Sequence, residues 1–75
     1  MVLAFVLVVI KAGKDKEVLK KLRSYREVEE AHHIYGQYDI IIKTKTEDLQ
    51  SLDRFINKLR KLKNIKATST MITME

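Results

Sequence analysis

The 75-residue chain has no cysteine, no proline and no tryptophan, and it contains only two glycines. Without cysteine, it can form neither disulfides nor thiolate zinc sites. A chain this short buries a modest fraction of its surface, so it needs reinforcement by disulfides, a metal or self-association. We expect self-association to supply that reinforcement, in the reducing cytoplasm that a cysteine-free composition suits.

The charge is unbalanced toward lysine and arginine, with 15 basic against 10 acidic residues and a formal net charge of +5. In both main basic groups, apolar residues are interleaved at helical spacing, which is typical of solvated helix faces rather than of a nucleic-acid patch. The groups are Lys14, Lys16, Lys20, Lys21 and Arg23, then Lys58, Arg60, Lys61, Lys63 and Lys66.

The N-terminal run MVLAFVLVVI could be mistaken for a targeting segment. It is shorter than the roughly 20 apolar residues that a membrane-spanning helix needs, and no basic region precedes it. Its β-branched composition predicts a central strand covered on both faces, and we expect no membrane association.

Periodicity along the chain predicts six elements in the order strand, helix, strand, strand, helix, strand. Asp15 is expected to cap the first helix and Thr46 the second, with Glu47 and Asp48 in the first turn of the second helix. The expected bounds are a strand over Val2 to Ile10, a helix over residues 15–25, strands over Val28 to Tyr35 and Tyr38 to Lys45, a helix after Thr46 with its apolar stripe reaching Leu62, and a strand over Ile65 to Met74.

This order predicts that residues 1–75 form one α+β domain with the ferredoxin-like βαββαβ fold. Two helices would cover one face of a four-stranded antiparallel sheet whose first and third strands are central. The first strand is apolar on both faces, yet no residues remain to cover its second face. We therefore expect a homodimer, sheet against sheet, forming a dimeric α/β sandwich or barrel.

Few residues offer catalytic or metal chemistry. His32 and His33 are adjacent in a strand, so their side chains point to opposite faces and cannot share one ion. Val28, Glu30, His32 and Ile34 are expected on one face of that strand. No P-loop, dinucleotide fingerprint, nucleophile elbow or zinc motif is present in the sequence. We expect no metal, no cofactor and no enzymatic activity.

The hairpin connection stands out because Asp39 leads directly into three isoleucines. Gly36 and Gln37 are expected to form a two-residue type II′ turn, which requires glycine first. That turn leaves Asp39 unexplained. Its carboxylate could accept hydrogen bonds from nearby backbone amides, or it could bind a ligand.

The stretch "VEEAHHIYGQYDIIIKTKTEDLQSLDRFINKLRKLKNIKATSTMITME" resembles the effector-binding domain of the Lrp/AsnC, or feast/famine, transcription regulators. Its most specific elements are the G-x-x-D hairpin and the pattern Ile65…Thr68-x-Thr70. The resemblance implies a ferredoxin-like fold, sheet-to-sheet dimers that assemble into rings, and small effectors, usually amino acids, bound between dimers. It departs from the family in one respect, because no helix-turn-helix domain precedes the first strand. We therefore expect a stand-alone module with no direct DNA binding.

The resemblance also implies which residues bind the effector. Asp39 would accept the ligand ammonium, while amides around Gly36 and threonine or serine hydroxyls would receive its carboxylate. The ligand-binding residues implied are Tyr35, Gly36, Gln37, Tyr38 and Asp39 in the hairpin, with Thr68, Ser69, Thr70, Met71 and Ile72 in the last strand.

The function implied is an amino-acid effector-binding module for transcription regulation, acting as a ring-shaped homo-oligomer or altering the response of a full-length Lrp/AsnC relative. Two other classes stay open. One is a ferredoxin-like dimeric α/β-barrel enzyme of monooxygenase type, in which His32 or His33 would matter. The other is a nucleic-acid binder, although the central strands lack the exposed aromatic residues that such a sheet uses.

Overall fold

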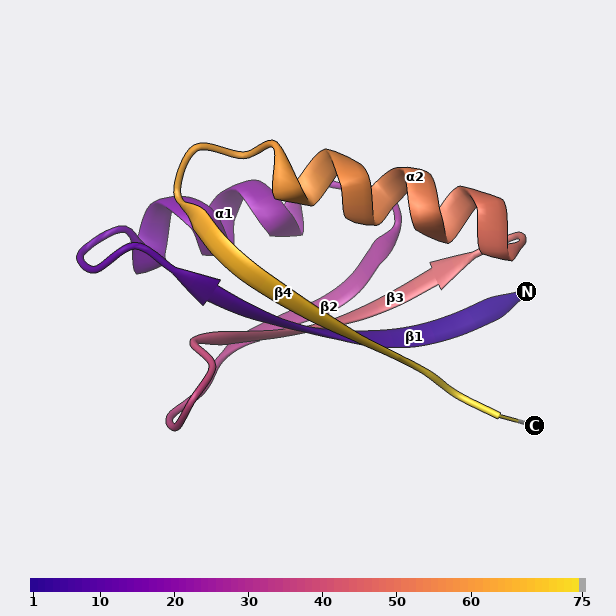
Figure 1. Ribbon diagram of the computed structural model, residues 1–75, viewed down its shortest axis with the longest axis horizontal. Coiled ribbons are helices and arrows are strands. Elements are labelled where there is room, and N and C mark those ends of the chain that lie inside the picture. Colours follow the sequence, from indigo (N-terminus) through magenta and orange to yellow (C-terminus); the bar gives the residue numbers. More distant parts are fainter. Residues whose placement is uncertain (75) are drawn as a thin grey trace.

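The strands and helices follow one another in the order that the sequence predicts. They are β1 (Val2–Ile10), α1 (Asp15–Arg23), β2 (Val28–His33), β3 (Ile40–Thr46), α2 (Leu49–Arg60) and β4 (Ile65–Ile72). The computed structural model describes residues 1–74. Its strands form one antiparallel sheet in the order β2-β3-β1-β4, which confirms the ferredoxin-like α+β fold with β1 and β3 at the centre. Both helices lie on the same side of that sheet (Figure 1).

Strand β1 contributes side chains to both faces of the sheet, and only one of these faces is covered by the layer of helices. Its side chains alternate between the two faces of the sheet, as they must in an extended chain. Ala4, Val6 and Val8 are fully buried beneath the helices. The intervening Phe5 and Leu7 lie on the opposite face and are only partly buried. The core on the helix side is completed by Val18 and Leu22 of α1, Leu52, Phe55, Ile56 and Leu59 of α2, and Ile40 and Ile42 of β3.

The face of the sheet opposite the helices is covered by no element of residues 1–74 (Figure 1). We call it the open sheet face. Among its apolar side chains are Leu3, Phe5, Leu7 and Val9 of β1, Ile41 of β3, and Ala67 and Met71 of β4. The N-terminal apolar run is thus a strand, as predicted, and among the helices of residues 1–74 none has the length and apolar character to cross a membrane.

Both helices end earlier than the apolar stripes predict, in a tight final turn. The amide of Tyr25 donates to the carbonyl of Leu22 (3.2 Å), and that of Leu62 donates to the carbonyl of Leu59 (3.0 Å). Each of these bonds joins an amide to the carbonyl three residues earlier, and not four residues earlier as in an α-helix, which is typical of a helix end. Tyr25 and Leu62 still pack against the core, so the stripes continue past the helices themselves.

The predicted helix caps are wrong at both positions. Asp15 is the first residue of α1, and the capping position belongs to Lys14, whose side chain makes no capping bond. Asp48 caps α2, because its Oδ1 accepts the amide hydrogen of Ser51 (2.8 Å). Thr46 cannot cap α2, since it is still the last residue of β3 and pairs with Val2.

Removing the Asp48 cap is expected to make the fold less stable in a pH-dependent way. The amide of Ser51 holds the pKa of the Asp48 carboxyl below its usual range. A lowered folded pKa adds stability above the unfolded pKa of about 3.9, and that stability is lost as pH falls through the folded value. Asp48→Ala should therefore lower the melting temperature at pH 7, with the deficit shrinking in acid, as circular dichroism melts would show.

The control for this effect is Glu47→Ala, because the Glu47 carboxylate accepts no hydrogen bond within residues 1–74. It should melt close to the wild type at every pH. Equal deficits in the two variants would mean that charge near the helix start matters, rather than the capping bond.

Candidate functional site

The hairpin connection is longer than the sequence predicts. Strand β2 ends at His33 and β3 begins at Ile40, so the connection has six residues, 34–39, and not the two of a type II′ turn. It is closed by a hydrogen bond from the amide of Ile34 to the carbonyl of Asp39 (2.9 Å). Gly36, at the exposed tip, has a φ of +124°, which strongly favours glycine. The predicted two-residue turn is therefore wrong, although its glycine is needed.

Asp39 is held against the end of β1. Its amide donates to the carbonyl of Val8 (2.8 Å), and its Oδ2 accepts the amide hydrogen of Ile10 (2.9 Å). The last regular pair of β1 and β3 is Val8 with Ile40, so the carboxylate stands in for the next carbonyl of the ladder. Asp39 therefore does bond a backbone amide, but that amide belongs to Ile10 of β1 and not to the turn. Its other oxygen, Oδ1, accepts no hydrogen bond from residues 1–74, so the carboxylate keeps capacity for a ligand.

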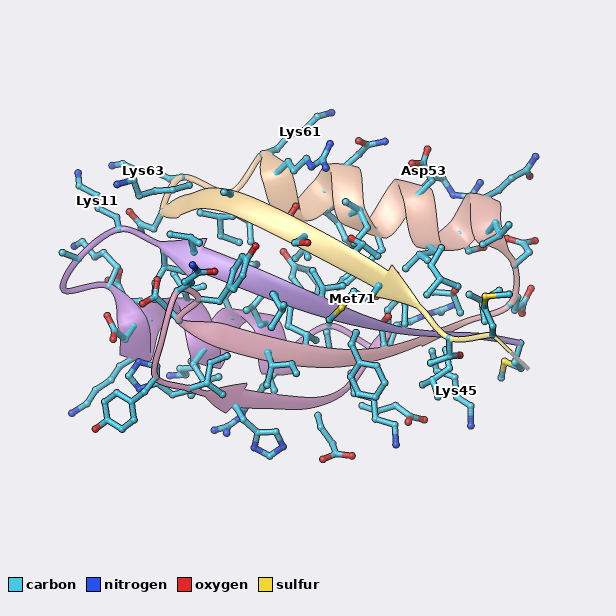
Figure 2. All side chains as sticks on the ribbon, turned by 60° about the horizontal axis from the view of Figure 1, so that its bottom comes forward. Lys11, Lys45, Asp53, Lys61, Lys63 and Met71 are labelled. Atoms are coloured by element: carbon cyan, nitrogen blue, oxygen red, sulfur yellow. The ribbon has the colours of Figure 1, made fainter. Side chains whose placement is uncertain are left out.

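The candidate residues of the last strand divide between the two faces of the sheet. Thr68, Thr70 and Ile72 pair with Val8, Val6 and Ala4, the residues that β1 turns toward the helices. Ser69 and Met71 pair with Leu7 and Phe5, on the open sheet face. Figure 2, turned so that the bottom of Figure 1 comes forward, shows Met71 on that face. Five consecutive residues therefore cannot line one pocket of a single chain.

The hairpin and the far half of β4 do not meet within one chain. Asp39 lies beside Val8, whereas Ile72 pairs with Ala4, four residues along β1. At about 3.3 Å per residue, this separates them by roughly 13 Å along the strand. Tyr35, at the hairpin tip, is fully exposed. A site that uses both groups must therefore be shared between chains.

A groove runs between α2 and β4 and contains the helix-facing candidates. It consists of two hollows, of about 420 and 360 Å³, which share Arg60. We call it the α2–β4 groove. The larger hollow is lined by Leu49, Leu52, Asp53, Ile56, Arg60, Thr70 and Ile72, and the smaller by Arg60, Ile65, Lys66, Ala67 and Thr68.

The α2–β4 groove combines opposite charges, hydroxyls and apolar surface. Arg60 donates from Nε to the hydroxyl of Thr68 (3.2 Å). Neither Arg60 nor Asp53 takes part in an ion pair within residues 1–74, so both charges are available to a ligand. Leu49 and Ile72 are about half exposed and give the groove an apolar wall. Such a groove can hold a small zwitterion with an apolar side chain.

The sequence-predicted site does not include Asp53 and Arg60, although their spacing in the sequence could have indicated them. Arg60 belongs to a basic group interpreted as a solvated helix face. Asp53, Ile56 and Arg60 are spaced by three and four residues, however, which places them on one flank of a helix. That flank meets β4 only because α2 packs beside this edge strand, and Figure 2 shows Asp53 on α2.

The two histidines lie on opposite faces of the sheet, as predicted. His32 pairs with Ile41 and contacts Glu30 (Nε2–Oε1, 3.1 Å), while His33 pairs with Ile40. His33 contacts the start of α1 through Asp15 (Nε2–Oδ2, 2.9 Å). The hydrogen bond with His32, and then the charge of Lys43, hold the pKa of the Glu30 carboxyl below its usual range. Within residues 1–74, no three potential metal-ligating side chains come together.

A β-bulge between Val28 and Glu30 corrects the predicted face of β2. Val28 pairs with Thr44 but Glu30 pairs with Lys43, so one extra residue is inserted in β2. Val28 consequently packs against the core, whereas Glu30 and His32 lie toward the open sheet face. The prediction that Val28 shares a face with Glu30 and His32 is wrong.

Known proteins resemble this chain over its whole length. The family model of the Lrp/AsnC ligand binding domain matches residues 3–75. HTH-type transcriptional regulator FL11 of Pyrococcus furiosus is 35% identical over 74 residues, which are 99% of this chain and 49% of that protein. The chain therefore spans about half the length of the curated relatives it matches.

Solved structures extend the similarity to the fold. The structure of FFRP-DM1 has a TM-score of 0.96 and 51% sequence identity, and the match covers 99% of this chain and 100% of that one. The structure of Escherichia coli AsnC has a TM-score of 0.90 and 32% identity, and the match covers 99% of this chain and 51% of that one.

Proposed function

Because this chain belongs to the Lrp/AsnC family through its ligand-binding domain, we propose that it binds a free amino acid as an effector in transcription regulation. The observation that carries the proposal is the α2–β4 groove, with an unpaired guanidinium, an unpaired carboxylate and an apolar wall. The regulator NMB0573 of Neisseria meningitidis, which is 18% identical and of which the match covers 50%, was solved as an L-Met complex.

The groove suits the carboxylate end of an amino acid. A guanidinium presents paired N–H donors that match a carboxylate. Arg60 would bind the carboxylate, and the hydroxyl of Thr70 on the neighbouring strand would donate a further hydrogen bond. The ligand's side chain would rest on Leu49 and Ile72, which are exposed in the isolated chain.

The ammonium can face the carboxylate of Asp53 in the same groove, and a second chain can supply a further acceptor. The hairpin of a neighbouring chain would present Asp39, whose Oδ1 accepts no hydrogen bond from residues 1–74. Tyr35, Gly36, Gln37 and Tyr38 would approach the ligand with it. This arrangement explains how hairpin and strand residues that lie apart in one chain can serve one site.

The composition of the open sheet face supports the assembly part of the proposal, in which two chains pair sheet to sheet. The open sheet face presents aliphatic and aromatic side chains from the central strands, with Lys43 and Lys45 of β3 beside them and Glu30 on the edge strand β2. Apolar side chains with charged neighbours are typical of a protein interface. Ser69 and Met71 would then contact the partner chain. Such dimers would assemble further into a ring and bring hairpins next to grooves, either alone or together with a full-length relative.

The experiment that tests the proposal is a thermal-shift screen with the twenty amino acids at millimolar concentration. A ligand that binds the native state raises the melting temperature by mass action, so at least one amino acid should do so. Calorimetry on the best ligand then gives the affinity and stoichiometry. A screen in which no amino acid raises the melting temperature would contradict the proposal.

Two variants of Asp39 separate its roles in structure and in binding. Asp39→Ala leaves the partly buried amide of Ile10 without an acceptor, so it should lower the free energy of unfolding by about 1–3 kcal/mol. Asp39→Asn keeps an oxygen acceptor and should stay near wild-type stability. Because the asparagine has no charge, the affinity of Asp39→Asn for the amino acid should nevertheless be about tenfold to a hundredfold lower than that of the wild type, as measured by calorimetry. Unchanged affinity in Asp39→Asn would leave Asp39 as a structural residue alone.

A further inference from the structure

A third hollow lies at the other end of the molecule from the hairpin. Its volume is about 640 Å³, and it is formed by the turn before β2, the end of β3 and one flank of α2 from Ser51 to Lys58. Figure 2 shows Lys45, one of its lining residues, far from Lys11 and Lys63 at the opposite end. We call it the basic hollow, because its charged lining consists of Arg26, Lys45, Arg54 and Lys58 with Glu27 and Glu47.

Within residues 1–74, two of the cations in the basic hollow have no anionic partner. Lys58 is paired with Glu27 (Nζ–Oε2, 3.6 Å) and lies over the ring of Tyr25. Lys45 is paired with Glu29, which is outside the lining (Nζ–Oε2, 3.8 Å). Arg26 and Arg54 form no ion pair within residues 1–74, and Arg54 donates only to the hydroxyl of Ser51 (3.1 Å).

The basic hollow is separate from the α2–β4 groove, although both use α2. Ser51, Arg54 and Lys58 are spaced by three and four residues along one flank of the helix. Asp53 and Arg60 lie on the other flank, which borders β4. The two sites therefore share no lining charge, and a ligand in one leaves the other open.

We propose that the basic hollow binds a small molecule that carries a phosphate group. Within residues 1–74, the two cations of the hollow without an ion-pair partner, Arg26 and Arg54, carry two positive charges. A phosphate monoester carries about −1.5 to −2 at pH 7, which matches the charge of these two guanidiniums. The two unpaired guanidiniums offer the forked donors that phosphate oxygens accept bidentately. The volume falls in the range of about 300–1,000 Å³ typical of ligand pockets, so a nucleotide-sized molecule fits rather than a single ion.

Calorimetric titration with ATP and with pyrophosphate tests the site. The double variant Arg26→Gln/Arg54→Gln should bind both at least about tenfold more weakly than wild type. The matched control, Lys61→Gln/Lys63→Gln, removes the same charge outside the hollow and should change affinity by about twofold or less, because exposed distant charges are screened by salt. Equal weakening of the two double variants, or no binding by the wild type at millimolar ligand, would overturn the proposal.

A variant that is expected to bind more tightly makes the test independent of folding defects, because a misfolded protein would lose affinity and not gain it. Glu47→Gln removes an exposed lining carboxylate that forms no ion pair within residues 1–74, so it should tighten ATP binding. Unchanged or weaker binding by Glu47→Gln would count against the site. Titration with citrate, an anion without phosphate, tests whether the hollow selects phosphate groups. If citrate binds as tightly as pyrophosphate, the assignment to phosphate is overturned. Titration with the amino-acid effector reports on the α2–β4 groove separately.

Discussion

Leu7→Lys should convert the proposed sheet-to-sheet dimer into monomers. Leu7 lies at the middle of the open sheet face, between Ile41 of β3 and Ser69 of β4. In a two-fold dimer each substitution appears twice, so two lysines would be buried within one apolar interface. The penalty for burying an unpaired charge is several kcal/mol, which weakens the dimer by more than about a hundredfold. Light scattering coupled to size exclusion would show the loss of mass.

A matched control separates the interface from the added charge. Gln50→Lys adds the same charge on the exposed side of α2, away from the open sheet face, and should keep the wild-type mass. A Leu7→Lys variant that keeps the wild-type mass, or a wild type that is already monomeric at micromolar concentration, would contradict sheet-to-sheet pairing.

Arg60→Gln should lower the affinity for the amino-acid effector by about tenfold to a hundredfold. The variant loses a charge-assisted hydrogen bond to the ligand carboxylate, which contributes about 1.5–3 kcal/mol. It keeps an amide that can still bond Thr68, so stability should change little. Calorimetry with the best ligand of the thermal-shift screen measures the loss.

The neighbouring lysine supplies the control for Arg60. Lys61 follows it directly and is exposed, outside the lining of the α2–β4 groove. Lys61→Gln removes the same charge from the same helix end and should bind like the wild type. Parallel losses in both variants would point to a general electrostatic attraction instead of a carboxylate anchor.

Periodicity was enough to predict the fold because each buried strand and helix carries its own pattern. The doubly apolar β1 and the stripe through Leu52, Phe55 and Leu59 are set by residues that touch the core directly. The hairpin length was wrong for a different reason. Asp39 bonds Val8 and Ile10, which are about 30 residues away in the chain, so its conformation next to β3 depends on contacts with β1. Local turn preferences contain no information about such a bond.

The candidate site could be predicted only in part. Thr68, Thr70 and Ile72 line the α2–β4 groove, but strand alternation sends Ser69 and Met71 to the other face. A resemblance by position groups neighbours in the chain, whereas a pocket groups neighbours in space. Asp53 and Arg60 line the groove only because α2 packs beside β4. The pattern of the helix alone therefore predicts that both side chains are exposed to solvent.

A crystal structure with the best ligand of the screen would show whether a free amino acid occupies the α2–β4 groove. We predict that the ligand carboxylate lies within hydrogen-bond distance of the Arg60 guanidinium, with the ammonium facing Asp39 of a neighbouring chain. A ligand bound elsewhere, with Arg60 and Thr70 still facing solvent, would contradict binding in the groove.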